Sequence, residues 1–178
     1  MIGLTLMGHI LTGDDVLSKI GTKHASLVCD PQTCLGSFGE SYQITTDEIE
    51  KAEKYLVDVW AGARSKFKCE TFNKLRIHYV IGSTPKPLHS LPPTSSVIHG
   101  HIKRAYYVIK KIINLLNDPN IYLDPLSYGW VSEHDMLIPE KCLNPLPLEM
   151  SVVVNVQENV EQRIVHAKGV LKMCYILS

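Results

Sequence analysis

The chain has 178 residues, of which 45% are hydrophobic and 20% are charged, so it can bury a core and is not a mainly disordered protein. Its 18 Lys and Arg are matched by 18 Asp and Glu. Overall charge therefore excludes a chain that is basic throughout, and any nucleic-acid surface has to be a local patch. The five cysteines form no Cys-x-x-Cys pair, so neither a zinc site nor a disulfide framework is indicated.

No stretch approaches the roughly 20 apolar residues that a membrane-spanning helix needs. The apolar start of the chain also lacks the basic residues of a secretory signal. We therefore expect an intracellular protein without a membrane partner, located in either the nucleus or the cytoplasm.

In chain order, the first expected elements are two short helices around a turn at 12–14, ending near residue 28. A loop is expected over 29–41, where a proline and two glycines interrupt the pattern. The next helix has the clearest start in the chain, because Thr45 followed by Glu48 forms a capping box. Apolar residues then recur at helical spacing until Gly62 ends the run.

A shorter helix is expected over 70–81, with Phe72, Leu75 and Tyr79 on its buried side. The proline-rich connector 83–94 then leads to the longest predicted helix, over 95–117. The apolar stripe of this helix consists of Ile98, Ile102, Ala105, Tyr106, Ile109, Ile113 and Leu116.

Beyond Pro119, the segments around Trp130 and Ile138 predict two short strands joined by an acidic turn. The sequence thus predicts a mainly α fold: a small helical bundle with a short β-hairpin near residues 129–139 and an irregular C-terminal tail. We expect three parts, which are an N-terminal part (1–40), a helical domain with the connector and the hairpin (41–148), and the tail (149–178).

Two adjacent aspartates, Asp14 and Asp15, lie in the first turn. Carboxylates can hold a divalent metal ion beside a phosphate, and a glycine-bounded turn followed by lysines can present backbone N–H groups to that phosphate. The alternative is that one aspartate caps a helix while Lys19 and Lys23 lie in solvent.

The long helix carries a second candidate surface. The basic residues that flank its apolar stripe are Lys103, Arg104, Lys110 and Lys111. Such a face can follow a phosphate backbone, and the alternative is a solvated helix face. His99 and His101 are two residues apart and so point in different directions on a helix, which makes them a poor metal pair.

Three segments together resemble a known arrangement. "HILTGDDVLSKIGTKHA" at 9–25 is similar to the turn of PIN-like nucleases of the flap-endonuclease class, which leads into a helix-hairpin-helix-like turn. "SLPPTSSVIHGHIKRAYY" at 90–107 and "LDPLSYGWVSEHDMLIPE" at 123–140 follow in the same order as in invertebrate proteins associated with mobile elements. In those proteins a PIN-like nuclease region precedes a helical region, and the resemblance covers roughly residues 8–148.

The resemblance places the family's acidic position on Asp15, whereas Asp14 falls where a cysteine is common in the family and is a metal candidate by its carboxylate alone. It places the phosphate-facing turn on 20–23, where Gly21 and Lys23 lie, although Lys19 replaces the first glycine of that turn.

Nucleases of this class assemble several carboxylates from strands that precede this motif, whereas few residues precede His9 here. One aspartate cannot position metal ions and an attacking water. We therefore expect no catalysis by this chain alone, and Mg²⁺ only if a complete nuclease site is assembled.

In the resembled proteins, the segment after the hairpin often runs into a cysteine-rich, zinc-binding region of the CXC type. Residues 151–178 contain one cysteine. A one-base frame shift can turn five codons into cysteine codons with the spacing Cys-x-Cys-x3-Cys-x4-Cys-x-Cys, and these encode Val154, Val156, Val160, Val165 and Ala167. We therefore predict a tail that is translated out of frame from about residue 151 and that packs poorly.

The leading interpretation is a truncated, non-catalytic fragment of a mobile-element-derived, nuclease-like protein that binds DNA weakly. The residues expected to contact DNA are Lys19, Gly21, Lys23, Lys103, Arg104, Lys110 and Lys111. One alternative is a helical module that binds another protein chain and no nucleic acid, which fits the neutral net charge better. The other is a metal nuclease whose missing carboxylates come from a partner chain.

Overall fold

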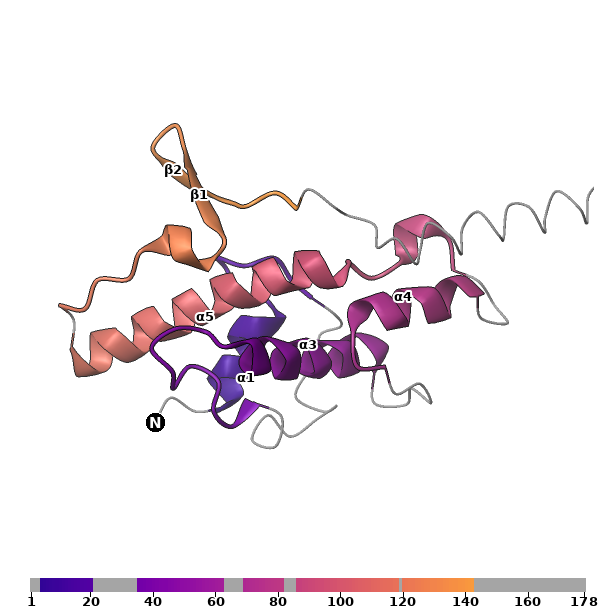
Figure 1. Cartoon of the computed structure of the whole chain (residues 1–178), viewed down its shortest axis with the longest axis horizontal. Coiled ribbons are helices and arrows are strands. Elements are labelled where there is room, and N and C mark those ends of the chain that lie inside the picture. The colour runs from indigo at the N-terminus through magenta and orange to yellow at the C-terminus, as the bar shows by residue number, and fades with distance from the viewer. Residues whose placement is uncertain (1–3, 21–34, 63–68, 82–85, 119, 143–178) are drawn as a thin grey trace, which may run out of the picture.

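A computed structural model of the chain describes residues 4–20, 35–62, 69–81, 86–118 and 120–142. In this part of the chain, a small bundle is formed by four helices: α1 (Leu4–Thr12), α3 (Thr46–Ala61), α4 (Phe72–Ile81) and α5 (Ser95–Asn117). An antiparallel hairpin of β1 (Trp130–Glu133) and β2 (Met136–Pro139) projects from the bundle on the side of α5 away from α3 (Figure 1). The mainly α fold with a short hairpin is confirmed, and the predicted tail lies outside the described residues.

Helix α3 starts at the predicted capping box. The Thr45 hydroxyl accepts a hydrogen bond from the Glu48 N–H at 3.3 Å, and one Glu48 carboxylate oxygen accepts a bond from the Thr45 N–H at 2.9 Å. The other Glu48 oxygen accepts from the Gly39 N–H at 3.2 Å, which ties the preceding segment to the helix. The helix ends before Gly62, whose φ of 82° is one that glycine adopts without strain.

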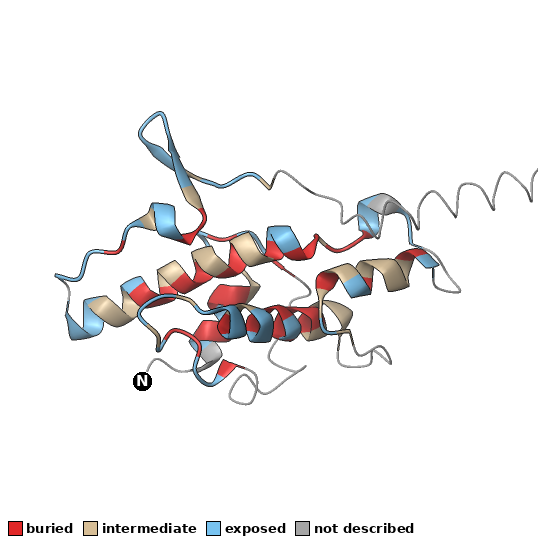
Figure 2. Cartoon of the chain, viewed as in Figure 1, coloured by how far each residue is buried: buried red, intermediate tan, exposed pale blue. Residues whose placement is uncertain are grey.

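Helix α5 has the predicted bounds, with Thr94 as its N-cap. Its apolar stripe is buried from Ile98 to Ile109, and the buried sides of α3 and α5 face each other (Figure 2). The predicted stripe is wrong at its end, because Leu116 is 73% exposed. With 23 residues, α5 is longer than the 16-residue α3, so its last turns extend past the helix that covers the rest (Figure 1).

Helix α4 begins slightly later than predicted, at Phe72. Phe72 and Leu75 are buried as predicted, but Tyr79 is only half-buried, and the neighbouring Val80 is buried instead. Val80 is buried because it packs with Leu91 of the proline-rich connector in a small separate cluster. The helical period of α4 does not indicate where the connector lies, so it could not predict this contact.

The N-terminal turn is confirmed at Gly13, whose φ is 105° and whose Cβ, if present, would lie 2.5 Å from the Lys19 Cα. The second predicted helix does not form over residues 14–20, and its remainder lies outside the described residues. The segment instead folds back, with the Ile20 N–H donating to the Thr12 carbonyl at 2.8 Å. Along this path both Leu17 and Ile20 are buried in the core.

The core runs across residue 40, where the sequence suggests a boundary between parts. Residues before position 40 belong to the same hydrophobic cluster as the buried residues of α3 and α5. They are Met7, Ile10, Leu11, Leu17, Ile20, Leu35 and Phe38. The Phe38 ring packs edge-on against Tyr106 of α5, with ring centres 5.3 Å apart. Residue 40 is therefore not a boundary of the core.

The hairpin has both predicted strands, paired from Trp130 with Pro139 to Glu133 with Met136. Its turn residues, His134 and Asp135, have φ values of 50° and 59°, as the tight two-residue turns of hairpins require. A 3₁₀ turn, η3 (Pro125–Tyr128), precedes the hairpin and packs on α5.

Candidate functional site

The acidic turn uses Asp14 to hold its own backbone. One Asp14 carboxylate oxygen accepts hydrogen bonds from the Val16 and Leu17 N–H groups, each at 2.9 Å. These bonds close a local turn in which the side chain holds the backbone, and no helix follows Asp14 over residues 14–20 for it to cap. Asp15 is exposed. Within the described residues, no three His, Cys, Asp or Glu side chains are grouped so that they could hold a metal ion.

The basic residues of the two predicted surfaces, the N-terminal turn and the long helix, differ in their surroundings. Lys19 is exposed, and Gly21 and Lys23 lie outside the described residues. Lys110 is expected on an exposed face, but the structure buries it, leaving 9% exposed, and its Nζ donates to the Gly39 carbonyl at 3.3 Å. The physical reason is that the segment before α3 covers this side of α5, so the amine finds its partner inside the bundle.

Arg104 and Lys111 are both engaged with neighbouring groups. The Arg104 Nη1 donates to the Gly129 carbonyl at 3.2 Å, and its guanidinium lies 5.8 Å from the centre of the Trp130 ring. Arg104 therefore fastens the hairpin to α5. Burial lowers the pKa of Arg104, and the nearby Glu140 carboxylate opposes that shift. The Lys111 Nζ lies 5.8 Å from the centre of the Tyr107 ring.

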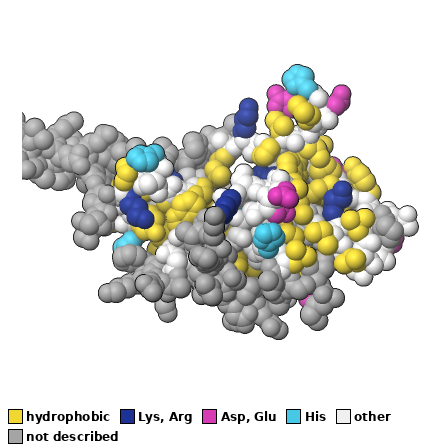
Figure 3. Space-filling model, turned by 180° about the vertical axis from the view of Figure 1, so that it is seen from behind, with side chains coloured by type: hydrophobic (Ala, Val, Ile, Leu, Met, Phe, Trp, Pro, Cys, Tyr) yellow, Lys and Arg dark blue, Asp and Glu magenta, His cyan; other side chains and the backbone are white. Residues whose placement is uncertain are grey.

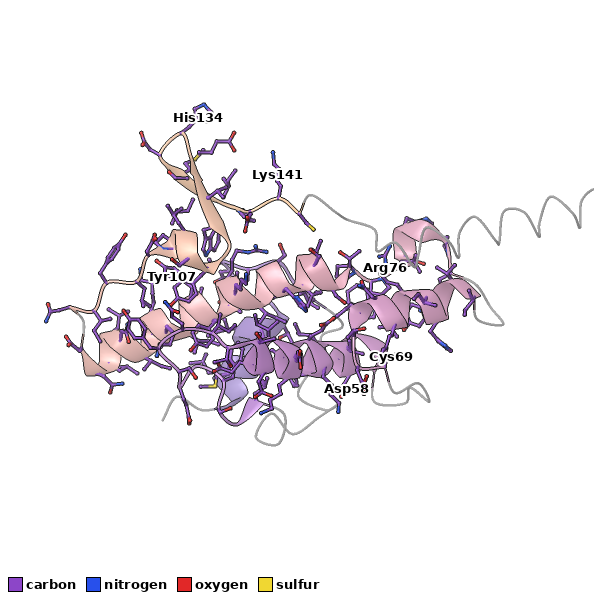
Figure 4. All side chains as sticks on the ribbon, in the orientation of Figure 1. Asp58, Cys69, Arg76, Tyr107, His134 and Lys141 are labelled. Carbon is purple, nitrogen blue, oxygen red and sulfur yellow. The ribbon has the colours of Figure 1, made fainter. Side chains whose placement is uncertain are left out.

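Lys103 and Arg104 border a hollow of about 690 Å³ at the start of α5, which we name the amino-terminal hollow. It is lined by Ser96, His99, Lys103, Arg104, Glu140 and Lys141, among others. Lys141 lies on the segment that returns from the hairpin over this half of α5 (Figure 4). Sequence reasoning missed Lys141, because its position depends on the direction in which the hairpin returns.

A buried carboxylate lies beside this hollow and was also missed. Glu53 of α3 is 2% exposed, and its Oε2 lies 2.7 Å from the His99 Nε2. Its Oε1 accepts a hydrogen bond from the Phe72 N–H at 2.9 Å, and the Ser95 side chain also bonds to Glu53. Burial alone would raise the pKa of Glu53, but the hydrogen bonds from His99, Ser95 and Phe72 outweigh it, so the pKa is lowered.

A serine, a histidine and a glutamate in contact raise the question of nucleophilic catalysis. In a catalytic triad the serine hydroxyl bonds to the histidine. Here the Ser95 side chain bonds to Glu53, and its Oγ accepts from the Asn73 N–H at 3.1 Å. The Asn73 side-chain oxygen in turn accepts from the Ser95 N–H at 3.0 Å. These bonds join α3, α4 and α5 and leave the hydroxyl unsuited to act as a nucleophile.

His99 and His101 point in different directions, as predicted. His99 faces Glu53 on α3, whereas His101 is 2% exposed and its Nε2 lies 2.8 Å from the Leu11 carbonyl at the end of α1. Burial lowers the pKa of His101, so its neutral form is favoured in the fold.

The fold and these contacts define a mainly α protein with a hairpin beside a partly basic hollow. The chain matches no known protein family, and comparison with curated proteins and with solved structures gives no similar protein. None of the helices in the described part of the chain is long and apolar enough to cross a membrane.

Proposed function

We propose that the chain is a binding protein that contacts the phosphate backbone of a nucleic acid at the amino-terminal hollow. One observation carries this proposal: Lys103 and Lys141, which are far apart in the sequence, line the same hollow. Arg104 also lines it, but Glu140 interacts with Arg104 and offsets its charge. The two lysines are therefore the cations left to meet a phosphate, and an ammonium does so without a fixed geometry.

The start of α5 adds to the positive charge of the amino-terminal hollow. Ser96, in the first turn of the helix, lines the hollow. The first turn of a helix carries a partial positive charge, which favours an anion nearby. The partial positive charge of the helix end and the full charges of the two lysines therefore both favour an anion in the hollow.

The sequence resemblance to PIN-like, mobile-element-associated proteins makes DNA the nucleic acid that we favour. We propose binding without cleavage, because a metal-dependent nuclease needs several convergent carboxylates. Asp14 commits one carboxylate oxygen to its own turn, which supports a structural role for this residue.

The test is the affinity of the full chain for a fluorescently labelled duplex of about 20 base pairs, measured by anisotropy at low salt. The double variant Lys103→Glu with Lys141→Glu is expected to lose at least about tenfold in affinity, because each change replaces an attraction to phosphate with a repulsion. The control is Lys54→Glu on α3, an exposed lysine outside this hollow. Equal binding by the double variant and the control would contradict the proposal.

The second candidate is the helical protein-interaction module. It is favoured by exposed apolar side chains at the other end of α5, where Leu115 is 65% exposed and Leu116 is 73% exposed, and at Tyr122, which is 80% exposed. Exposed apolar side chains that gather at one place are typical of protein interfaces. Binding at this end would depend weakly on salt and would not respond to changes at Lys103.

A further inference from the structure

A second hollow of about 330 Å³ lies at the carboxyl-terminal half of α5, and we name it the carboxyl-terminal hollow. It is lined by Tyr107, Lys111, Asn114, Leu115, Ile121 and Tyr122, among others. It forms where the chain, after leaving α5, folds back along the helix toward Leu123, which is 8% exposed. Its volume is at the lower end of the range of ligand pockets.

Three properties of this hollow indicate what could fill it. Its walls are largely apolar and aromatic, and Lys111 is the one charged side chain that lines it. The Asn114 side-chain nitrogen is buried and has no hydrogen-bond partner within the described residues. A buried donor without an acceptor is costly, so an apolar occupant that also brings acceptor oxygens and negative charge would complement the hollow.

The hairpin tip of this same chain has that chemistry. Met136 is 63% exposed and Leu137 is 48% exposed, and they are flanked by the exposed acidic residues Glu133 and Asp135. His134 lies at the outer end of the hairpin (Figure 4), and acidic side chains surround this tip above a body rich in apolar side chains (Figure 3). No packing within the described chain accounts for the exposed methionine and leucine, and a two-stranded hairpin is marginally stable by itself.

We propose that the chain self-associates by placing the Met136–Leu137 tip of one copy in the carboxyl-terminal hollow of a second copy. Glu133 and Asp135 of the first copy then face Lys111 of the second. Both halves of the interface are carried by one chain, and their charges are opposite, which is the reason that a second copy is the occupant we favour.

The direction of the hairpin fits this arrangement. The hairpin projects away from the bundle (Figure 1), so its tip is presented outward. Two copies related by a two-fold axis can exchange tips, so that each hollow is filled and the assembly closes as a dimer. The small contact at each tip predicts weak association, with a dissociation constant of about 10–100 µM. The amino-terminal hollow lies at the other half of α5 and is independent of this contact.

The test is sedimentation velocity of the full chain between about 1 and 300 µM. We expect a monomer at the low end and a dimer at the high end. Met136→Ser with Leu137→Ser is expected to weaken association at least about tenfold, because the apolar anchor is lost. The control Ile81→Ser, at a side chain of α4 that is 60% exposed, is expected to leave association unchanged.

A charge exchange tests the pairing without altering the apolar anchor. Lys111→Glu is expected to weaken association about tenfold, and adding Glu133→Lys in the same chain is expected to restore it. Circular dichroism checks that each variant keeps its helices. A monomer at all concentrations would overturn the proposal, even if it binds an added acidic and apolar peptide, because the partner would then be another protein. A dimer that ignores both sets of changes would overturn it as well.

Discussion

Replacement of the buried Glu53 is expected to destabilise the bundle more than replacement of any exposed carboxylate. In Glu53→Ala, the Phe72 N–H and the Ser95 side chain lose their acceptor in a region where both residues are at most 8% exposed. Each unsatisfied buried donor costs about 1–3 kcal/mol. The His99 side chain is 41% exposed, so water can take the place of Glu53 as its hydrogen-bond partner. Loss of the Glu53–His99 contact therefore adds little to the destabilisation. The free energy of unfolding should therefore fall by about 2–6 kcal/mol.

The assay is urea unfolding followed by far-ultraviolet circular dichroism, with the midpoint and the slope fitted for each variant. Glu53→Gln keeps the size of the side chain and one acceptor oxygen, so it should be destabilised less than Glu53→Ala. Glu50→Ala, at an exposed position of the same helix, serves as the matched control and should change stability by no more than about 0.5 kcal/mol. If Glu53→Ala and Glu50→Ala unfold at the same urea concentration, Glu53 does not join α3 to α4 and α5, and the reasoning fails.

Further predictions concern a histidine, a lysine and a glycine. Because burial lowers the pKa of His101 below 6.5, stability should be complete above about pH 6.5 and decline as the pH falls toward 5, and His101→Gln should remove this part of the decline in urea unfolding. Lys110→Ala loses a buried hydrogen bond and should cost about 1–2 kcal/mol in the same assay, whereas Lys111→Ala should cost almost nothing; equal effects would contradict the burial of Lys110. Gly13→Ala should lower the thermal midpoint more than Gly62→Ala, because both have positive φ but only Gly13 lacks room for a Cβ; the reverse order would contradict the turn geometry.

The sequence was sufficient for elements that local signals specify. The capping pair of Thr45 and Glu48 defines the start of α3, and the 3.6-residue apolar period together with Thr94 defines α5. The hairpin follows from two short apolar runs around an acidic turn. Each of these signals lies within a few residues of the feature it predicts.

The contacts that build the candidate site depend on distant parts of the chain. Lys110 looks like a solvated lysine from its helix alone, and only the segment before α3 makes it a buried donor. The pairing of Glu53 with His99 joins residues 46 positions apart, and no spacing rule relates them. Lys141 meets Lys103 because the hairpin returns over the start of α5. Such contacts are set by tertiary packing, and the composition and periodicity of the sequence do not predict which distant residues will meet.

The most direct test of the proposed nucleic-acid contact is the salt dependence of duplex binding. Two lysine–phosphate contacts predict that the logarithm of the affinity falls with the logarithm of salt concentration with a slope of about −2 between about 50 and 200 mM. The account predicts this slope for the unmodified chain and a slope near zero for Lys103→Glu with Lys141→Glu. A steep slope that persists in the double variant, or salt-independent binding by the unmodified chain, would contradict the role of the amino-terminal hollow.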